Sequence, residues 1–592
     1  MTNKKSNQRT VFKKLKNILS FILVIVYIFV LFPVYATESQ EARFIDVPEG
    51  HWAEDVIHRL RELKITNGIG NNEFGLGLTI ARSEFVTYLV RLMQWELIYP
   101  EKGSFIDNTD TSKWYYSYIE TALKNGAISG NEEKFRPEEP ITREEMAVMI
   151  VNTLGYDSLA KEMGYLGKPF EDVEQNTGYI TIAKDFGIIN GVGDNLFKPC
   201  NTATREEAAA MMIRMFNKMH QYFEELNAFY AIQSVGQMDL IEKLDSVCFG
   251  WSRLEYDQEN DQVILNTTRK NNNEFAFPID FSEPIKKAKE SNVIAQLMVY
   301  ADNGTLISPD KEKKVPLLEY ILFNSEQRIQ AVNSIIEQVN DVIVENEKIS
   351  FDGVVIDFES MKGEELSKSF NIFLQELKKE LDKTNKKLFV AVHPRRKPGL
   401  EFYDGYDYRT IGEIADRIIL MAHDYYAKSL NSKEKDNGYT LTPLSPLDEV
   451  YFALRAITDK DTGVQDLDKI WLQISFDTVQ WKLKNGKVDN QYPYKPSYDA
   501  VRQRLLKGAV INYGKLSRNP YATFYDSQDE TDNVLWYEDS RSVQAKIDLA
   551  RMFGIKGLSL WRLGNIPNYG ENGTIEIYLD VWQQILGNYT EK

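Results

Sequence analysis

The chain has 592 residues, of which 43% are hydrophobic and 12% aromatic, and its formal net charge at pH 7 is -17. This length is too great for one hydrophobic core, so the sequence predicts two or more folded domains, and the composition excludes a disordered chain. Because a strongly acidic surface repels polyanions, nucleic acid is excluded as a partner and anionic lipid is disfavoured.

The first 36 residues have the pattern of an export signal. All their charged residues are Lys or Arg, an apolar run covers residues 18–34, and small side chains stand at Val34 and Ala36. The pattern predicts a signal peptide over residues 1–36, cleaved after Ala36, and a secreted protein. The alternative is an uncleaved membrane anchor, because the apolar run is about long enough to span a bilayer. The two cysteines, Cys200 and Cys248, fall in different predicted domains, so neither a disulfide nor a cysteine metal cluster is expected.

Residues 44–218 contain three related units. Each opens on a Phe-x-Asp step and later shows an Arg-x-Glu step before an apolar helix, and the arginines of these steps are Arg82, Arg143 and Arg205. A regular period of this kind indicates an array of similar units. In the second unit Thr142 is a good helix N-cap, and Glu145 three residues later completes a capping box.

The three units resemble S-layer homology domains, whose motif reads ITRAE, over residues 44–98, 104–158 and 169–218. The resemblance implies a helical three-fold assembly that binds secondary cell wall polysaccharide. It also implies that Arg82, Arg143 and Arg205 contact that ligand, since a guanidinium binds a carboxylate in bidentate fashion. The alternative is that these arginines only pair with the nearby Glu84, Glu145 and Glu207. The first repeat departs from the motif at Ala81, and the third departs at Tyr179 and Ala203, so we expect weaker grooves there.

Residues 219–243 lack repeat signals and predict a helical connector. Residues 244–588 alternate short apolar runs with amphipathic helices, which predicts an α/β fold, a (β/α)8 TIM barrel with a small insertion before the last strand. The insertion falls between Ser475 and Gly557 and is rich in tyrosine. The candidate strands are Val247–Trp251, Phe275–Ile279, Val293–Val299, Gly353–Asp357, Leu388–Val392, Ile418–Met421, Ile470–Ser475 and Gly557–Trp561.

Residues 351–359, Phe-Asp-Gly-Val-Val-Ile-Asp-Phe-Glu, are typical of a buried parallel strand that ends in acids. The alternation of a strand places Asp357 and Glu359 on the same face. Acids are costly inside such a strand unless they lie at its exposed end, where a barrel has its active site. Two carboxyls at one strand end can take different pKa values and therefore different catalytic roles.

This run resembles the DGxDxDxE signature of glycoside hydrolase family 18, which includes chitinases and peptidoglycan-cleaving N-acetylglucosaminidases. The chain departs from it at Val355, where the family has an acid or an amide. Residues 421–426, Met-Ala-His-Asp-Tyr-Tyr, resemble the family's MxYDY segment, and Trp561 stands where the family has a tryptophan beneath the cleaved sugar. The resemblance implies that substrate is bound by His423, Asp424, Tyr425 and Trp561.

Each of these assignments has an alternative. His423 occupies the family's tyrosine position, and an imidazole N–H replaces the phenol only in the right tautomer. Trp561 can instead plug the end of the barrel core. Asp357 and Glu359 can form a structural ion pair with Arg395 or Arg396, or a metal site, although further metal ligands do not cluster here. His393, at the end of the fifth strand, is as well explained by packing as by substrate contact.

The resemblance implies hydrolysis with retention, assisted by the substrate's own acetamide, with no cofactor and no metal. Glu359 would protonate the glycosidic oxygen, and Asp357 would orient the acetamide and balance the positive charge of the oxazolinium. The chain is therefore predicted to be a glycosidase at the cell wall or S-layer of a Gram-positive-type envelope. It would cleave β-1,4 bonds in N-acetylglucosamine-containing glycans, either peptidoglycan or chitin. The alternatives are a non-catalytic or weakly active carbohydrate-binding barrel and a purely structural S-layer subunit.

Overall fold

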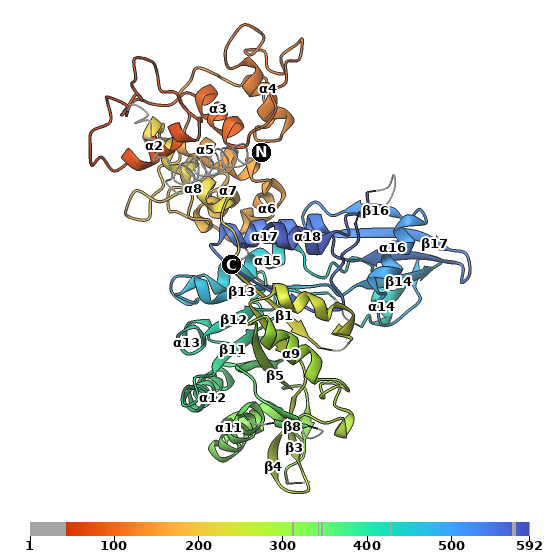
Figure 1. Cartoon of the computed structure of the whole chain (residues 1–592). Helices are drawn as coiled ribbons and strands as arrows, with labels where there is room; N and C mark the ends of the chain where they lie inside the picture. The colour runs from red at the N-terminus through yellow and green to blue at the C-terminus, as the bar shows by residue number, and fades with distance from the viewer. Residues whose placement is uncertain are drawn as a thin grey trace, which may run out of the picture. The chain divides into compact units, whose positions relative to one another are not determined.

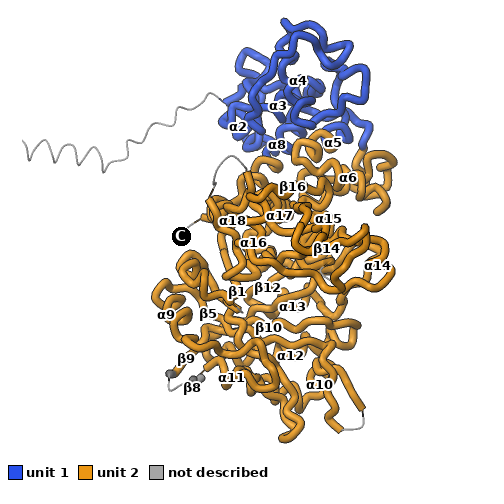
Figure 2. Tube along the Cα trace, turned by 90° about the vertical axis from the view of Figure 1, so that its right-hand side faces the viewer, with its two compact units in different colours: residues 1–146, 199–213 blue, residues 147–198, 214–592 orange. Residues whose placement is uncertain are grey.

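The structure of the chain is a computed structural model that describes residues 43–231, 233–310, 313–340, 342–344, 347–426, 429–570 and 576–590. The expected signal peptide, residues 1–36, lies outside the described residues. The chain divides into two compact units, residues 1–146 with 199–213 and residues 147–198 with 214–592 (Figure 2). In the described part of the chain, no helix combines the length and the apolar character needed to cross a bilayer.

The region of the repeats is mainly helical, as the sequence predicts. Helices α3, α5 and α8 each begin at a motif arginine. The predicted capping box is confirmed, because Glu145 Oε2 accepts from the Thr142 amide at 2.9 Å and the Glu145 amide donates to Thr142 Oγ1 at 3.2 Å. The helices are α2 (Glu54–Glu62), α3 (Arg82–Leu92), α4 (Tyr116–Lys124), α5 (Arg143–Thr153), α6 (Asp157–Met163), α7 (Thr177–Asp185) and α8 (Arg205–Met219).

The opening Phe-x-Asp step of each repeat holds the later turn of the same repeat. In the first repeat the Asp46 carboxylate accepts from the amides of Phe74 and Gly75, each at 2.7 Å, and the rings of Phe44 and Phe74 lie 5.7 Å apart. The carboxylate accepts hydrogen bonds from turn amides that would otherwise have no partner. This explains why the Phe-x-Asp step is present in every repeat. The same contacts are made by Asp107 with Phe135 and Arg136, and by Asp172 with Phe197 and Lys198.

In the first unit, the three segments that precede the motif arginines form a closed backbone ring. Ile80 donates its amide to the Ala203 carbonyl at 3.1 Å, Ala203 donates to Ile141 at 3.0 Å, and Ile141 donates to Ile80 at 3.0 Å. Each segment thus donates one backbone hydrogen bond and accepts another, and the ring brings the three motifs together. The three-fold arrangement that the resemblance implies is present in this ring.

Within the described residues of the second unit, eight parallel strands pair in a closed circle. The predicted TIM-type barrel is confirmed. Helices α11 (Ser325–Asn340), α12 (Glu364–Asp382) and α13 (Tyr408–Ile414) lie side by side along the outside of the strands (Figure 1). The strands are β1 (Glu225–Tyr230), β2 (Ser246–Phe249), β5 (Ile294–Asp302), β10 (Gly353–Glu359), β11 (Lys387–Val392), β12 (Arg417–Leu420), β13 (Ile470–Ser475) and β19 (Gly557–Trp561).

Two expectations about the barrel strands differ from the structure. The first strand, β1, lies inside residues 219–243, where a helical connector was expected. Two polar residues of this strand, Glu225 and Asn227, interrupt its apolar run, so the sequence does not have the pattern of a buried strand. The strand tolerates them because both point into the barrel, where the side chains of Arg417 and Ser246 form hydrogen bonds with them. Residues 275–279 form no strand, because the Asn273 side chain bonds both the amide and the carbonyl of Phe275, at 3.0 and 2.9 Å, and so replaces a strand partner.

The insertion before the last strand is confirmed. Residues 479–536 form a five-stranded antiparallel sheet in the order β15-β14-β18-β17-β16. Lys495, within this insertion, pairs with Asp477 just beyond the carboxyl end of β13 at 2.9 Å, so the insertion reaches the mouth of the barrel. The elements are β14 (Val479–Lys484), β15 (Lys487–Val488), α16 (Tyr498–Leu506), β16 (Val510–Tyr513), β17 (Pro520–Asp526) and β18 (Thr531–Trp536).

The remaining elements of the second unit belong to the barrel or its loops. They are β3 (Arg253–Asp257), β4 (Gln262–Asn266), α9 (Ser282–Glu290), β6 (Leu306–Ile307), β7 (Val315–Pro316), α10 (Leu317–Phe323), β8 (Val342–Val344), β9 (Glu347–Ile349), α14 (Ser432–Asp436), α15 (Leu447–Ile457), α17 (Ser540–Met552) and α18 (Val581–Gly587). Short 3-10 turns complete the described chain.

Candidate functional site

The two acids of the 351–359 run lie at the carboxyl end of β10, on the face that points into the barrel. Asp357 is 5% exposed, and its Oδ1 has no hydrogen-bond partner among the described residues. Glu359 is the last residue of the strand and is partly exposed. A buried carboxylate oxygen without a partner is costly, so this arrangement indicates a site that a ligand completes.

Burial controls the ionisation of both acids. It raises the pKa of Asp357 far above the usual value for an aspartic acid, and the neighbouring charge of His423 offsets only part of this rise. Burial also raises the pKa of Glu359, and the negative charges of Asp357, Asp302 and Asp424 raise it further. Glu359 therefore retains a proton near neutral pH, as a general acid must.

A cavity of about 380 Å³ opens beside Glu359. The structure thus brings together four of the predicted site residues, because Glu359, His423, Asp424 and Tyr425 all line this cavity. Asp424 has a left-handed backbone, with φ of 57°, a strained conformation that is often found at functional sites. The other lining residues are Lys362, His393, Pro394, Arg396, Glu401, Phe402, Tyr403 and Met421.

Both ring nitrogens of His423 have protein partners. Nδ1 lies 2.9 Å from Asp424 Oδ2, and Nε2 lies 2.7 Å from Gln473 Oε1. Burial alone would lower the pKa of His423, but the charge of Asp424 and the hydrogen bonds to Asp424 and Gln473 outweigh it and raise this pKa. With both nitrogens occupied, the ring has no N–H left for a substrate carbonyl in this arrangement.

Tyr425 offers a donor instead. Its hydroxyl is buried and has no hydrogen-bond partner in the described part of the chain. The ring is held by Arg396, whose guanidinium lies 5.3 Å from the ring centroid and also pairs with the buried Glu449 at 2.7 Å. Arg395 lies over Tyr408. Since Arg396 is engaged by Glu449, it does not provide the structural ion pair that was the alternative explanation for Asp357 and Glu359.

Val355 and Trp561 do not line the cavity and instead pack in the apolar interior of the barrel. Trp561 is half-buried at the end of β19, with its ring 5.3 Å from that of Phe229, and it is not among the residues that line the cavity. Val355 is fully buried in the apolar core of the barrel, where it packs with Phe229, Met298 and Phe389. The position where the family has an acid or an amide is therefore part of the hydrophobic core in this chain.

Two further residues at the site, Asp302 and Gln473, were not predicted, and a third, His393, was left open between packing and substrate contact. Asp302 ends β5 and pairs in register with Glu359, and the apolar run before it is the same signal that identified β10. Gln473 is a single amide within an apolar strand, which was a visible but unused signal. His393 ends β11, and burial together with the charge of His423 lowers its pKa to about 4, so its ring is neutral.

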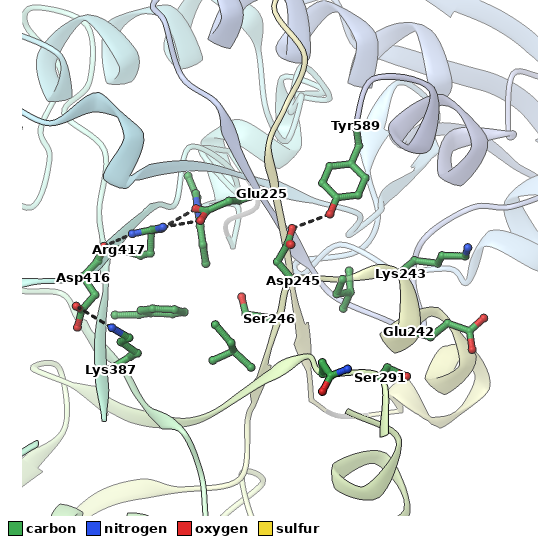
Figure 3. A pocket seen from close by; sticks show the side chains of 15 residues that line it. Glu225, Glu242, Lys243, Asp245, Ser246, Ser291, Lys387, Asp416, Arg417 and Tyr589 are labelled. Atoms are coloured by element: carbon green, nitrogen blue, oxygen red, sulfur yellow. Dashed lines mark hydrogen bonds and ion pairs between the residues drawn. The ribbon is translucent and has the colours of Figure 1, made fainter. Parts of the chain in front are cut away.

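A larger pocket, of about 680 Å³, lies at the opposite, amino end of the barrel strands (Figure 3). Two of its acids, Glu225 and Asp416, are paired with bases. Glu225 binds Arg417 through both of its oxygens, at 2.5 and 2.6 Å, and also accepts from Trp471 Nε1 at 2.8 Å. Asp416 pairs with Lys378 at 2.9 Å and Lys387 at 3.8 Å. Paired charges at this end of a barrel are typical of structural support.

In the repeats, the motif arginines and glutamates pair in a closed circle. Arg82 pairs with Glu145 at 2.5 Å, Arg143 with Glu207 at 3.2 Å, and Arg205 with Glu84 at 2.5 Å. The second oxygen of each glutamate caps its own helix. The arginines are only 3–7% exposed. The pairing that was the alternative explanation for these arginines is present, and each pair joins two different repeats.

Aromatic side chains are more accessible than the arginines. Trp52 is 62% exposed and Trp114 is 56% exposed, and both follow the opening Phe-x-Asp step of their repeats. Within the opening steps of the same repeats, Ile45 and Ile106 are 70% and 61% exposed. In the third repeat Tyr179 holds this place and donates to Asp157 at 2.6 Å. Exposed indoles are suited to stack on sugar rings, and the first two repeats present such indoles.

Comparison with known proteins identifies the families of the repeats and of the barrel. Residues 314–565 match the model of glycosyl hydrolases family 18, and residues 43–86, 109–147 and 169–209 match the S-layer homology domain. The chain therefore carries three S-layer homology domains, and its barrel belongs to glycosyl hydrolases family 18. Both expected resemblances, and with them a domain of a glycosidase family, are confirmed.

Individual relatives resemble parts of the chain. An amylopullulanase of Thermoanaerobacterium thermosulfurigenes is 32% identical over 193 residues, which make up 32% of this chain and 10% of that protein. The cortical fragment-lytic enzyme of Bacillus subtilis (strain 168) is 23% identical over 284 residues, 44% of this chain and 62% of the enzyme. The crystal structure of the spore cortex-lytic enzyme SleL of Bacillus megaterium QM B1551 matches with 20% identity and a TM-score of 0.46, over 63% of this chain and 75% of that one. The chain spans less than two thirds of the length of both curated relatives.

Proposed function

We propose that the chain is a secreted glycoside hydrolase, held at the cell wall by its S-layer homology repeats. Its substrates are β-1,4-linked glycans that contain N-acetylglucosamine, such as peptidoglycan or chitin. The observation that carries this proposal is the pair of acids at the end of β10, of which Asp357 is buried and Glu359 is partly exposed. Glu359 keeps its proton because of burial and of the negative charge of Asp357, and it faces an open cavity.

In the proposed reaction, Glu359 donates its proton to the glycosidic oxygen as the bond to C1 breaks. The carbonyl oxygen of the substrate's own 2-acetamido group attacks C1 and forms a cyclic oxazolinium. Asp357 accepts a hydrogen bond from the acetamide N–H through the oxygen that has no protein partner, and its charge balances the cation. Glu359 then takes a proton from water, which opens the oxazolinium with net retention.

The cavity supplies the remaining contacts. The Tyr425 hydroxyl, which has no partner among the described residues, would donate to the acetamide carbonyl, and Asp424 would bind a sugar hydroxyl. Trp561, which ends β19 and does not line the described cavity, would contact the sugar in a bound complex. His423 does not bind the substrate directly in this proposal, because both of its ring nitrogens already have protein partners. It acts instead through its charge on Asp357 and Glu359.

The repeats are proposed to hold secondary cell wall polysaccharide. Exposed Trp52 and Trp114 provide stacking surfaces, whereas Arg82, Arg143 and Arg205 contribute mainly by holding the repeats together. The S-layer homology matches and a relative named for the lysis of cortical fragments both favour a substrate in the cell envelope. Cell-surface association follows from the repeats.

One assay tests this proposal. The mature protein is incubated separately with chitin oligosaccharides and with peptidoglycan, and new reducing ends, their initial anomeric form and binding are all measured. New reducing ends with retained configuration support the proposal. Binding without new reducing ends would instead support the carbohydrate-binding barrel, which the buried proton donor disfavours. A thiazoline analogue of the oxazolinium should inhibit hydrolysis and should bind the Asp357→Asn variant less tightly than the wild type.

A further inference from the structure

A string of buried polar side chains crosses the interior of the barrel behind His423. Its members, Gln473 on β13, Ser559 on β19 and Asn227 on β1, are at most 2% exposed, and we call them the polar string. Gln473 Nε2 lies 3.3 Å from Ser559 Oγ, and Ser559 Oγ lies 2.8 Å from Asn227 Oδ1. Buried amides in an apolar barrel are retained only where hydrogen bonds satisfy them, so the string has a defined geometry.

The far end of the string fixes the direction of every hydrogen bond in it. Asn227 Nδ2 lies 2.9 Å from Ser246 Oγ and 3.3 Å from the Ser246 carbonyl oxygen. Ser246 belongs to β2 and lines the pocket at the amino end of the barrel (Figure 3). Because a carbonyl only accepts, the Asn227 nitrogen must face Ser246, and its oxygen must face Ser559. The single hydroxyl proton of Ser559 then goes to Asn227, so Ser559 accepts from Gln473.

The near end of the string therefore determines the protonation of His423. With its nitrogen committed to Ser559, Gln473 presents Oε1 to His423 Nε2 at 2.7 Å, and that ring nitrogen must carry a proton. The other nitrogen, Nδ1, faces Asp424 Oδ2 at 2.9 Å. Burial alone would raise the pKa of Asp424, but the charge and hydrogen bond of His423 and the charge of Lys495 outweigh it and lower this pKa. Two acceptors thus face the two nitrogens, and the ring is an imidazolium.

We propose that the polar string is a positioning device that holds His423 as a fixed cation beside Asp357 and Glu359. The inference rests on the proposed function, in which these two acids perform the reaction. The cation stabilises ionised Asp357, for which no other charge-balancing partner lies nearby in the described residues. A single proton is then kept on Glu359, the residue that must donate it. A neutral tyrosine at position 423 would not have this effect. Gln473, Ser559 and Asn227 are positioning residues, since they act through His423.

Several other charged or titratable groups surround His423. His393, whose pKa is lowered to about 4, remains neutral and does not compete for the role of the cation. The acids around the ring outnumber the cations, which favours the imidazolium. The groups are Asp357 and Glu359 from β10, Asp302 from β5, His393 from β11, Asp424 beside the ring, Asp477 beyond β13, and Lys495 from the insertion.

The Gln473→Met variant tests the string, and Gln296→Met provides a matched control. Gln296 is another fully buried glutamine inside the barrel, on β5, and neither atom of its amide has a hydrogen-bond partner among the described residues. Ser559→Ala, which removes the hydroxyl between Gln473 and Asn227, is a second and milder variant of the string, for use if Gln473→Met does not fold. Circular dichroism establishes that each variant is folded before it is compared with the wild type.

The first measurement needs no activity. In protein labelled with ¹⁵N-histidine, the His423 signals, assigned by their loss in His423→Gln, are followed against pH. We expect both nitrogens of the wild type and of Gln296→Met to stay protonated at neutral pH, and the pKa of His423 to fall by roughly one unit or more in Gln473→Met. A neutral His423 in the wild type at pH 6, or an unchanged titration in Gln473→Met and Ser559→Ala, would overturn the proposal.

The second measurement is the pH profile of kcat on a chitin oligosaccharide. Because the cation lowers the pKa of both Asp357 and Glu359, its loss should move both limbs of the profile to higher pH. We expect a shift of roughly one pH unit in Gln473→Met, a smaller shift in Ser559→Ala, none in Gln296→Met, and little change in KM. A uniformly lowered rate with unmoved limbs would show a structural role only, and would overturn the proposal. No hydrolysis by the wild type would refute the proposed function, while the titration of His423 would still decide whether the string sets its charge.

Discussion

The two ends of the barrel contain similar numbers of charged side chains in opposite arrangements. At the amino end, Glu225 is bound by Arg417 and Asp416 lies beside Lys378, so each acid faces a base. At the carboxyl end, the charges of Asp357 and Asp302 act on Glu359, and the charge of His423 opposes them. The pocket at the amino end is larger than the cavity beside Glu359, yet of these two only the cavity beside Glu359 is lined by an acid whose pKa is raised. Unbalanced burial of charge therefore distinguishes the cavity beside Glu359 from the pocket at the amino end, and cavity volume does not.

The same contrast explains the cost of each arrangement. Paired charges at the amino end stabilise the fold modestly, because each partner offsets the desolvation of the other. Like charges at the carboxyl end destabilise the fold, and such strain is a common feature of sites that bind or react with a ligand. The circle of arginines and glutamates in the repeats resembles the amino end of the barrel in this respect. Each of the three motif arginines in the repeats has a glutamate partner.

The largest expected effect is on catalysis at the carboxyl end. Glu359→Gln keeps the shape of the side chain and removes its proton, so kcat on a chitin oligosaccharide should fall by at least about a hundredfold with little change in binding. Glu364→Gln is the matched control, because Glu364 is an exposed glutamate at the start of α12 that pairs with Lys368. Equal rates for wild type and Glu359→Gln would remove Glu359 from the mechanism.

The same substitution should stabilise the fold in a pH-dependent way. The pKa of Glu359 is raised above the ordinary 4.5, so the native state holds a proton that the unfolded state releases. Native stability of the wild type therefore falls as pH rises from 4.5 towards the raised pKa, by up to roughly 1.4 kcal/mol per pH unit. Denaturant unfolding should show Glu359→Gln gaining about 2 kcal/mol over the wild type near neutral pH and almost nothing at pH 4. A gap that does not depend on pH would contradict the raised pKa.

At the amino end the opposite result is expected. Glu225→Gln leaves Arg417 without its carboxylate while keeping an acceptor for Trp471, and it should lower the free energy of unfolding by about 1 kcal/mol, since both partners are partly exposed. The kcat should stay the same, because the pocket at this end has no part in the reaction. A loss of kcat as large as that of Glu359→Gln would end the distinction between the two ends.

Much of this contrast was visible in the sequence at the carboxyl end. The continuous apolar run before Asp357 identified a buried strand, and its alternation placed both acids on one face, as the structure shows. His423, Asp424 and Tyr425 follow β12 and line the same cavity as Glu359. Ends of parallel strands meet in a barrel, so residues at these positions converge without any knowledge of the loops.

The rest depended on contacts between residues that are far apart in the sequence. The β1 strand escaped detection because Glu225 and Asn227 break its apolar run, and their partners Arg417 and Ser559 lie far along the chain. The hydrogen bond of His423 Nε2 could not be predicted either, because its partner Gln473 lies on a different strand, 50 residues further along the chain. In the repeats, the regular period identified Arg82, Arg143 and Arg205, but only the folded ring shows that each pairs with a different repeat.

The smallest expected effect extends the contrast to the repeats. If the paired arginines hold these domains together, then polysaccharide binding should depend on side chains that are exposed and free of ion pairs. Trp114→Ala should weaken the sedimentation of the protein with purified cell walls by roughly fivefold, the scale of one lost stacking contact, and should leave the unfolding transition unchanged. Tyr99→Ala, at another highly exposed aromatic, is the control.

Arg143→Met should reduce sedimentation together with the stability of the repeats, because it removes the partner of Glu207. Loss of binding in Arg143→Met with no loss of stability would instead show that this arginine contacts the wall directly.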